Sequence, residues 1–189
     1  ERAMTQGKIA DVLELRAQLD EALRIRREEE LPVYEFLDDV RSRAMTQGKI
    51  ADVLELRGQL DEALRIRREE LLPVFERLGD VRSRAVTQGR IADVLQARGQ
   101  LDEALRIRRE EQLPVFERLG DVRERAVTQG RIADLLEARG QLDEALRIRR
   151  EEELPVYERL GDVRSRALVS SQIALQLLCR NDSESLAEA

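Results

Sequence analysis

The feature that most constrains the fold is a long segment that recurs along the chain at a fixed interval. The sequence AVTQGRIADVLQARGQLDEALRIRREEQLPVFERLGDVRER at 85–125 returns almost unchanged at 126–166 and 44–84, and with a few changes at 3–43. The four prolines give the period, because each follows the previous one by 41 positions (73 − 32, 114 − 73 and 155 − 114). A fixed period of roughly 20 to 50 residues indicates stacked supersecondary units rather than one globular core.

Each unit is expected to be a pair of antiparallel helices. In the third unit, apolar residues follow helical spacing between Asp80 and Gly99, which predicts a first helix, helix A. A second helix, helix B, is expected between Gln100 and Gly120. The two glycines are interpreted as left-handed stops, and Asp121 as the N-cap residue of the next helix A. Turns this short place the two helices side by side in opposite directions.

Helix B contains a proline in every unit. Pro114 removes a backbone donor and its ring clashes with the carbonyl four residues earlier, so we expect a kink or a break near Gln112–Leu113.

The first and last units depart from the repeat. Ala17 and Asp38 stand where later units have stop glycines, and Asn181 stands at the last stop position. We therefore predict a fifth helix A over 167–180 that covers the preceding helix B, followed by a frayed polar tail over 181–189. The complete prediction is one all-α domain over 1–189, a right-handed α-solenoid of antiparallel hairpins with repeats 3–43, 44–84, 85–125 and 126–166 and a C-terminal capping helix.

The predicted capping helix carries apolar residues on a face that is polar in the other A helices. This exposed strip is a candidate end interface with missing chain or another molecule, formed by Leu168, Leu175 and Leu178.

Composition excludes several functions. The net charge is −6, so an overall basic nucleic-acid footprint is absent. The chain has no His and a single Cys, Cys179, which we interpret as a small apolar packing residue. Phosphate-binding loops and metal-ligand motifs are missing, and acidic residues that repeat with each unit do not form one asymmetric site. We expect no catalytic residues, no metal, no cofactor, no membrane span and a cytoplasmic location.

The segment GRIADVLQARGQLDEAL resembles the tetratricopeptide repeat. Ala92, Gly99 and Ala104 match the small-residue positions of that family, and apolar residues match its hydrophobic positions. The usual repeat has about 34 residues, and the longer helix B of this chain is similar to repeats of kinesin light chains and of sensor regions in bacterial signalling NTPases and regulators. HEAT and armadillo repeats, with periods near 40, remain the structural alternative, although they lack the junction that GQLDEA reproduces.

Three polar residues depart from the family pattern at positions that are usually apolar or small. They are Gln88, Arg108 and Glu111. Buried polar groups need partners, so we expect Arg–Glu contacts or water between neighbouring hairpins.

The resemblance implies that helix A lines a concave groove. Equivalent positions of successive A helices form rows along this groove. The two acidic rows are Asp11, Asp52, Asp93 and Asp134, and Glu14, Glu55, Gln96 and Glu137; the groove cations are Lys8, Lys49, Arg90 and Arg131; and the glycine row is Gly7, Gly48, Gly89 and Gly130. The acidic rows suggest a ligand that carries Lys or Arg, and solvation or pairing with the groove cations is the competing interpretation. The glycine row is explained either by close packing of successive A helices or by close approach of a ligand backbone. The candidate groove residues are Gly48, Lys49, Asp52, Glu55, Gly89, Arg90, Asp93, Gln96, Gly130, Arg131, Asp134 and Glu137.

The sequence therefore predicts a non-catalytic protein–protein interaction scaffold, part of a larger signalling or regulatory protein, that binds a peptide or helical segment. The alternative is a structural module that stacks head to tail through its terminal repeats, and a homo-oligomer is its expected form. An engineered repeat array is a third interpretation, which the scattered exchanges between units disfavour.

Overall fold

The computed structural model describes the backbone of residues 1–187 and the side chains of residues 1–178, and the described residues form helices and turns without a strand. The predicted all-α fold class is confirmed. The chain divides into two compact units, Glu1–Arg98 and Gly99–Ala189. The third predicted repeat contributes to both of them, and a single solenoid over residues 1–189 stays a prediction.

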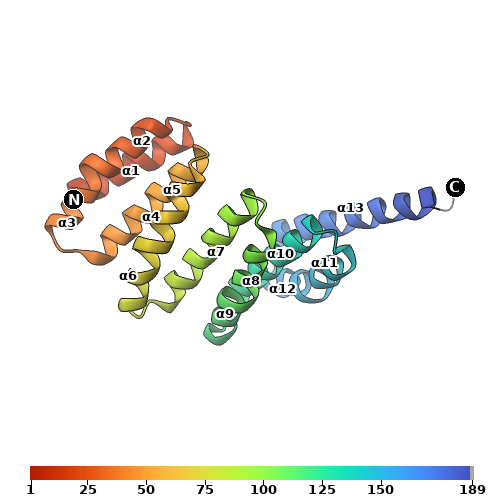
Figure 1. Ribbon diagram of the computed structural model, residues 1–189. Helices are drawn as coiled ribbons and strands as arrows, with labels where there is room; N and C mark the ends of the chain where they lie inside the picture. Colours follow the sequence, from red (N-terminus) through yellow and green to blue (C-terminus); the bar gives the residue numbers. More distant parts are fainter. Residues whose placement is uncertain (188–189) are drawn as a thin grey trace. The chain divides into compact units, whose positions relative to one another are not determined.

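The first unit contains two complete hairpins and the A helix of a third (Figure 1). Its A helices are longer than the pieces of its B helices, and each B helix consists of an α segment, a π-helical segment and a second α segment. The elements are α1 (Arg2–Leu15), α2 (Leu19–Ile25), η1 (Arg26–Glu30), α3 (Leu31–Phe36), α4 (Val40–Leu56), α5 (Leu60–Arg65), η2 (Ile66–Leu71), α6 (Leu72–Arg77) and α7 (Val81–Ala97).

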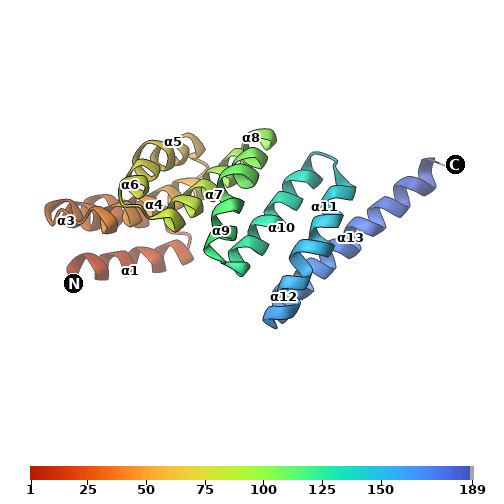
Figure 2. The same cartoon turned by 90° about the horizontal axis from the view of Figure 1, so that it is seen from below.

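The second unit begins with a B helix, continues with one complete hairpin and ends with a long helix that lies beside that hairpin (Figure 2). Its elements are α8 (Leu101–Arg106), η3 (Ile107–Gln112), α9 (Leu113–Leu119), α10 (Val122–Ala138), α11 (Leu142–Ile148), η4 (Arg149–Glu153), α12 (Leu154–Leu160) and α13 (Val163–Ala187).

The predicted stops between helices are confirmed. The glycines that follow helix A and helix B have φ between 63° and 76°, and the two non-glycine substitutes share this conformation, Ala17 with φ 58° and Asp38 with φ 52°. An N-cap aspartate begins the A helices α4, α7, α10 and α13; the Asp121 carboxylate, for example, accepts a hydrogen bond from the Glu124 amide at 3.1 Å. Hydrogen bonds from the amide and hydroxyl of Ser165 and from Arg123 lower the pKa of Asp162 to about 2.

The proline changes the winding of helix B without splitting the helix. Just before Pro73, the Leu72 amide donates to the carbonyl of Arg67, five residues back. The same bond joins Leu154 to Arg149. This wider π-helical turn moves the carbonyl that the proline ring would otherwise strike, so the chain continues as a helix through the proline.

Small and branched residues form the cores within each unit. In the first unit, Ala51, Val53 and Leu54 of α4 are buried in one cluster with Phe75 of α6. In the second unit, Val169 and Ile173 of α13 join residues of the α10–α12 hairpin. Helix α13 therefore covers the last hairpin, as the predicted capping helix does.

The C-terminal helix is longer than the sequence predicts. Helix α13 continues through Asn181 to Ala187, past the predicted helix end at 180, and the predicted fraying of the tail stays a prediction. Asn is tolerated within a helix, and the following sequence contains helix-forming Glu, Leu and Ala rather than a glycine. The prediction for the Cys179 side chain lies outside the described side chains.

Candidate partner-binding surface

The predicted groove residues lie on α4 and α7 in the first unit and on α10 in the second. Lys49 and Asp52 of α4 and Arg90 of α7 line one hollow of about 270 Å³, to which Gly48 also contributes. Glu55 and Arg90 line a second hollow nearby with Asp52. The structure thus brings together five of the eight predicted groove residues of these two helices. The other three, Gly89, Asp93 and Gln96 of α7, line neither hollow. The four residues of the second unit, Gly130, Arg131, Asp134 and Glu137, share α10.

The hollow between α4 and α7 also contains apolar side chains. Met45 of α4 is 53% exposed and Val86 of α7 is 37% exposed, and both line the hollow. Phe75 and Arg82 contribute to its walls as well. Val86 is a groove position that the helix-A pattern predicts, and Met45 occupies the equivalent position of the preceding A helix (86 − 45 = 41), so the repeat period was the signal that could have added Met45.

The acidic rows do not stand free in this groove. Each hairpin that lies within one unit buries an arginine of helix B against two acids of helix A. Arg67, 1% exposed, lies 2.6 Å from Asp52 and 2.9 Å from Glu55. Arg149, 2% exposed, lies 2.7 Å from Asp134 and 2.8 Å from Glu137.

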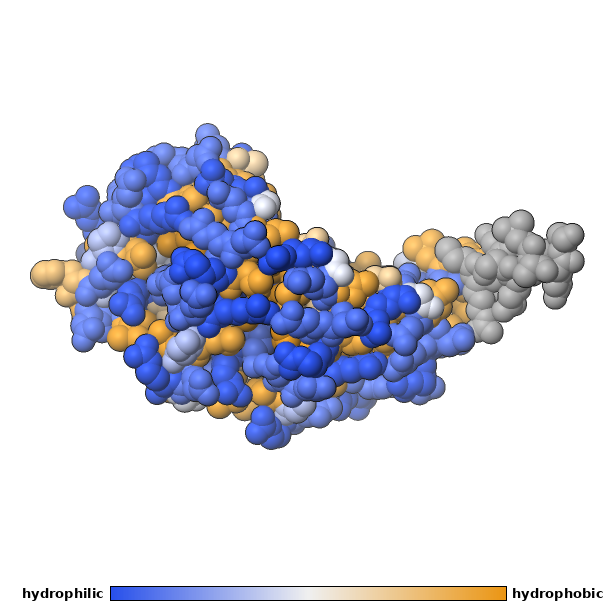
Figure 3. All heavy atoms as spheres, in the orientation of Figure 1, coloured by the Kyte–Doolittle hydropathy of each residue, from blue (hydrophilic) through white to orange (hydrophobic). Residues whose placement is uncertain are grey.

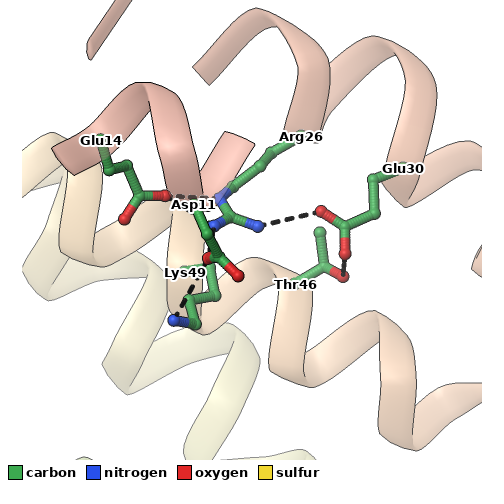
Figure 4. Close-up of polar contacts among 6 residues, drawn as sticks. All are labelled: Asp11, Glu14, Arg26, Glu30, Thr46 and Lys49. Carbon is green, nitrogen blue, oxygen red and sulfur yellow. Dashed lines mark hydrogen bonds and ion pairs between the residues drawn. The ribbon is translucent and has the colours of Figure 1, made fainter. Parts of the chain in front are cut away.

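The first hairpin shows the complete arrangement (Figure 4). Arg26 donates to Asp11 at 2.6 Å, to Glu14 at 2.6 Å and to Glu30 at 3.0 Å. Burial alone would lower the pKa of Arg26, but the hydrogen bond and charge of Glu14, with those of Asp11 and Glu30, raise it above its ordinary value. A buried cation needs this pairing, because an unpaired charge in a protein interior is costly.

The pairing changes the interpretation of the acidic rows. Asp52 and Glu55 hold a charge of the protein itself, so they are not two free carboxylates awaiting a basic ligand. The competing interpretation, pairing within the protein, therefore describes these acids better, but it named the wrong partner. The main partner is the buried arginine of the same hairpin, while the groove cations make longer contacts, such as Lys49 to Asp11 at 3.5 Å.

The prediction of polar contacts at the departures from the family pattern also needs a correction. At the positions equivalent to Gln88 and Glu111, Gln47 donates to Glu70 at 2.5 Å and Gln129 donates to Glu152 at 2.6 Å. These bonds join helix A to helix B of one hairpin, whereas we expected contacts between neighbouring hairpins. Glu70 and Glu152 also accept from exposed arginines of their own helix B.

The glycine row makes room for a helix-B side chain. A Cβ atom added to Gly7 would lie 2.7 Å from a carboxylate oxygen of Glu30, and one added to Gly130 would collide with the carboxylate of Glu153. At Gly48 the nearest atom belongs to Leu71, at an ordinary 3.7 Å. At Gly7 and Gly130 the close neighbour is therefore a carboxylate of helix B and not a successive A helix, whereas the approach of a ligand backbone stays a prediction.

One of these carboxyl groups has an unusual environment. Glu153 is 7% exposed and its Oε2 has no hydrogen-bond partner among the described residues. Burial, with a contribution from the charge of Asp134, raises the pKa of Glu153 to about 7, although Arg149 and Arg131 oppose the shift. Its counterpart Glu30 accepts a hydrogen bond from Thr46 of the next A helix at 3.1 Å.

Other kinds of site receive no support from the described side chains. Those residues contain no group of three or more His, Cys, Asp or Glu that could hold a metal ion. Over the same part of the chain, every helix is too short or too polar to cross a lipid bilayer.

Comparisons with known proteins agree on the fold. No protein-family model matches the chain, and no curated protein matches it. Two solved structures of a putative kinesin light chain from Podosopora anserina with nearly identical TPR-like repeats, one of them a single-residue variant, superpose with TM-scores of 0.75 and 0.76 at 20% identity; each match covers 99% of this chain and 90% of the other. The structure of BtubC (BKLC) from P. vanneervenii superposes with a TM-score of 0.66 at 16% identity, over 91% of this chain and 78% of that one. The predicted tetratricopeptide-like repeat fold is thus confirmed.

Proposed function

We propose that this helical-repeat chain is a non-catalytic scaffold for protein–protein interaction and binds a peptide or helical segment in the hollow between α4 and α7. The observation that carries the proposal is the hollow itself, where exposed Met45 and Val86 lie beside Lys49, Asp52 and Arg90. Binding sites commonly combine an apolar lining with a few placed polar groups. Because the hairpins are already ordered, binding has to order only the partner.

The chemistry of the hollow suggests a ligand with an apolar anchor. Arg67 holds Asp52 in place, whereas Lys49 is 48% exposed and able to reach a ligand acid. Because the acids are partly neutralised, the case for a purely basic ligand weakens. We propose a segment that places one apolar side chain against Val86 and Met45 and carries charges of both signs beside it. The chain would serve this role within a larger signalling or regulatory protein of the cytoplasm.

The absence of catalysis is part of the proposal. The charged clusters recur once per hairpin, and their members pair with one another, as Arg26 does with Asp11 and Glu14. A repeated, internally paired array does not present the single asymmetric site that acid–base chemistry requires.

The test is selection of peptides from a displayed random 12-residue library, followed by fluorescence anisotropy with each enriched peptide. We expect Val86→Glu and Lys49→Glu to weaken binding at least tenfold. Leu78→Glu is the matched control, since Leu78 is 45% exposed and does not line the hollow. Reversal of Asp52 is avoided because it would also leave the buried Arg67 without a partner.

Two results would contradict the proposal. One is the absence of any enriched peptide, and the other is a set of peptides whose affinity is the same for wild type and for Val86→Glu.

A further inference from the structure

Helix α13 packs against the preceding hairpin, but among the described residues no B helix of its own follows it. In α4 and α10, which pack against their own B helices, Ala44, Ala51, Ala126 and Ala133 are at most 1% exposed. The equivalent residues of α13, Ala167 and Ala174, are exposed. The opposite side of α13 is buried against the last hairpin through Val169, Ile173 and Gln176. One full face of α13 is therefore uncovered among the described residues.

The chain does not fold back to cover this face at the usual place. Helices α4, α7 and α10 each have 17 residues and are followed by a left-handed glycine two residues after their last residue. Helix α13 has 25 residues and passes through Asn181, the position equivalent to Gly58 (58 + 123 = 181). The antiparallel helix that α1, α4 and α10 receive within their units is thus not supplied at that turn.

The uncovered face has chemistry of its own. Leu175 and Leu178 stand where α4 has Asp52 and Glu55, the two acids that hold the buried Arg67. A helix with an arginine at that place would leave its charge unpaired against these leucines. The complementary partner is an uncharged, apolar helix.

The exposed leucines form a seam. Leu168, Leu175 and Leu178 are 63%, 62% and 60% exposed, and Ser171 lies between the first two. The spacing of three, four and three residues is the one that joins two helices side by side in a coiled coil. Figure 3 shows apolar surface over this end of the chain.

We propose that α13 packs antiparallel against α13 of a second copy of this chain, so that each α13 covers the face of the other that helix B covers in α4 and α10. A two-fold axis makes two copies of one helix antiparallel, as helices A and B are in each hairpin. With the axis near position 173, Leu168 of one copy faces Leu178 of the other, and Ser171 faces Leu175. The small Ser171 allows the two helices to approach closely.

Charge disfavours head-to-tail stacking onto the other end of the chain. The uncovered side of α1 includes Ile9 and Val12 but also Lys8 and Arg16. Packing that side onto the leucine seam would bury both cations without an acid opposite them. The two arrangements also differ in outcome, because a two-fold contact closes at the dimer whereas a head-to-tail contact continues to longer assemblies.

The proposal goes beyond peptide binding. It joins two copies through the second unit, and the hollow between α4 and α7 belongs to the first. A dimer therefore carries two hollows and would bind a ligand with two recognition segments more tightly than a monomer.

The first test is sedimentation velocity of the chain from about 1 to 300 µM, because a seam of three helical turns is small for an interface and micromolar dissociation is expected. We expect a monomer–dimer equilibrium with no larger species. Leu175→Glu should raise the dissociation constant at least tenfold while the helical circular dichroism is unchanged. Ile9→Glu on α1 is the matched control and should leave the dimer intact.

A second test reads the direction of the two helices, in a Cys179→Ser background that removes the native thiol. Leu168→Cys mixed with Leu178→Cys should form a disulfide between the two copies under oxidising conditions, and neither variant alone should do so. Three results would overturn the proposal. One is a chain that remains a monomer at 300 µM, and another is a set of assemblies larger than a dimer that disappear in Ile9→Glu. The third is a disulfide between two copies of the same cysteine variant.

Discussion

The first hairpin (α1 with α2, η1 and α3) and the last hairpin (α10 with α11, η4 and α12) share the helix-B sequence RREEELPVY, at 26–34 and at 149–157. In the first, Nε, Nη1 and Nη2 of Arg26 all donate to acids. In the last, Nε of Arg149 and Oε2 of Glu153 have no partners among the described residues. The same local sequence thus has two different polar environments.

The difference at the carboxyl group comes from the A helix that follows each hairpin, whereas the Nε partner of Arg26 is Glu14 of its own hairpin. Thr46 of α4 gives Glu30 a hydroxyl donor at 3.1 Å, whereas α13 has Val169 at the equivalent position (46 + 123 = 169). A donor to the charged form of a carboxyl group favours that form, and burial without one disfavours it. This agrees with a pKa of about 7 for Glu153. The neighbour in the stack thus determines which hydrogen-bond donor a repeated carboxyl group receives.

The largest expected effect comes from removing the buried arginine. Arg26→Met should cost about 3–5 kcal/mol at pH 6, because it leaves buried Glu30 without its cation. Arg149→Met should cost less at that pH, since Glu153, with a pKa of about 7, is largely protonated. Urea unfolding measures both, with Tyr34 reporting on the first hairpin and Tyr157 on the last.

The controls are Arg27→Met and Arg150→Met at the adjacent exposed positions, where surface pairs contribute at most about 1 kcal/mol. Equal losses for Arg26→Met and Arg149→Met would show that the two environments do not differ in energy.

The next effect is the pH dependence of the last hairpin. A carboxyl group with a raised folded-state pKa makes folding less favourable as pH rises, here from 4.5, the ordinary value, to about 7. Glu153→Gln should remove this slope, so that wild type and variant differ little below pH 4.5 and the variant is more stable by about 3 kcal/mol at pH 8. Gln112 already occupies the equivalent position and accepts from Arg108 at 2.9 Å.

Urea unfolding from pH 4 to 8, followed by Tyr157 in a Tyr34→Phe background, measures this slope. The same slope in the wild type and in Glu153→Gln would mean that Glu153 ionises in the folded chain as easily as in the unfolded one.

A smaller effect should follow from exchanging the neighbours. Val169→Thr supplies Glu153 with the donor that Glu30 has, and should stabilise the chain by about 1–2 kcal/mol at pH 8. The reverse change, Thr46→Val, should destabilise the first hairpin by a similar amount. Carboxyl NMR titration of Glu153 should show its pKa below 7 in Val169→Thr; an unchanged pKa would assign the shift to burial alone.

The repeat period and punctuation made the fold predictable, because each signal has a local cause. A left-handed residue is needed wherever a short turn follows a helix, so even Ala17 and Asp38 could be assigned by comparison with later units. The backbone conformation at the proline was harder to predict, because a wider helical turn and a break in the helix both accommodate a residue without a backbone donor. The structure has a π-helical turn, Ile66–Leu71, before Pro73.

The candidate site was predictable in position and less so in chemistry. Lys49, Asp52 and Arg90 of the predicted helix-A face line one hollow, whereas their role in binding a partner stays a prediction. The partner of Asp52 was missed because Arg67 is 15 positions away and its burial depends on the tilt of helix B. Likewise, Gly130 could not be matched to Glu153 from sequence spacing on a single helix.

The smallest expected effect concerns the turns of the same two hairpins. The first hairpin turns through Ala17 with φ 58°, and the last through Gly140 with φ 76°. Left-handed backbone is strained for alanine, whereas glycine adopts it freely at a cost in unfolded-state entropy. Ala17→Gly should therefore stabilise the first hairpin by about 0.5–1 kcal/mol, and Gly140→Ala should destabilise the last by about 1 kcal/mol, both measured by urea unfolding.

The control for this pair is Gln18→Ala, next to the turn at an exposed position with ordinary negative φ, where a change within about 0.5 kcal/mol is expected. Because no Cβ contact lies within 4 Å at Gly140, the cost of Gly140→Ala would come from the backbone alone. A loss of stability in Ala17→Gly would mean that the turn of the first hairpin is held by contacts of the Ala17 methyl group, and that its left-handed conformation carries no strain for glycine to relieve.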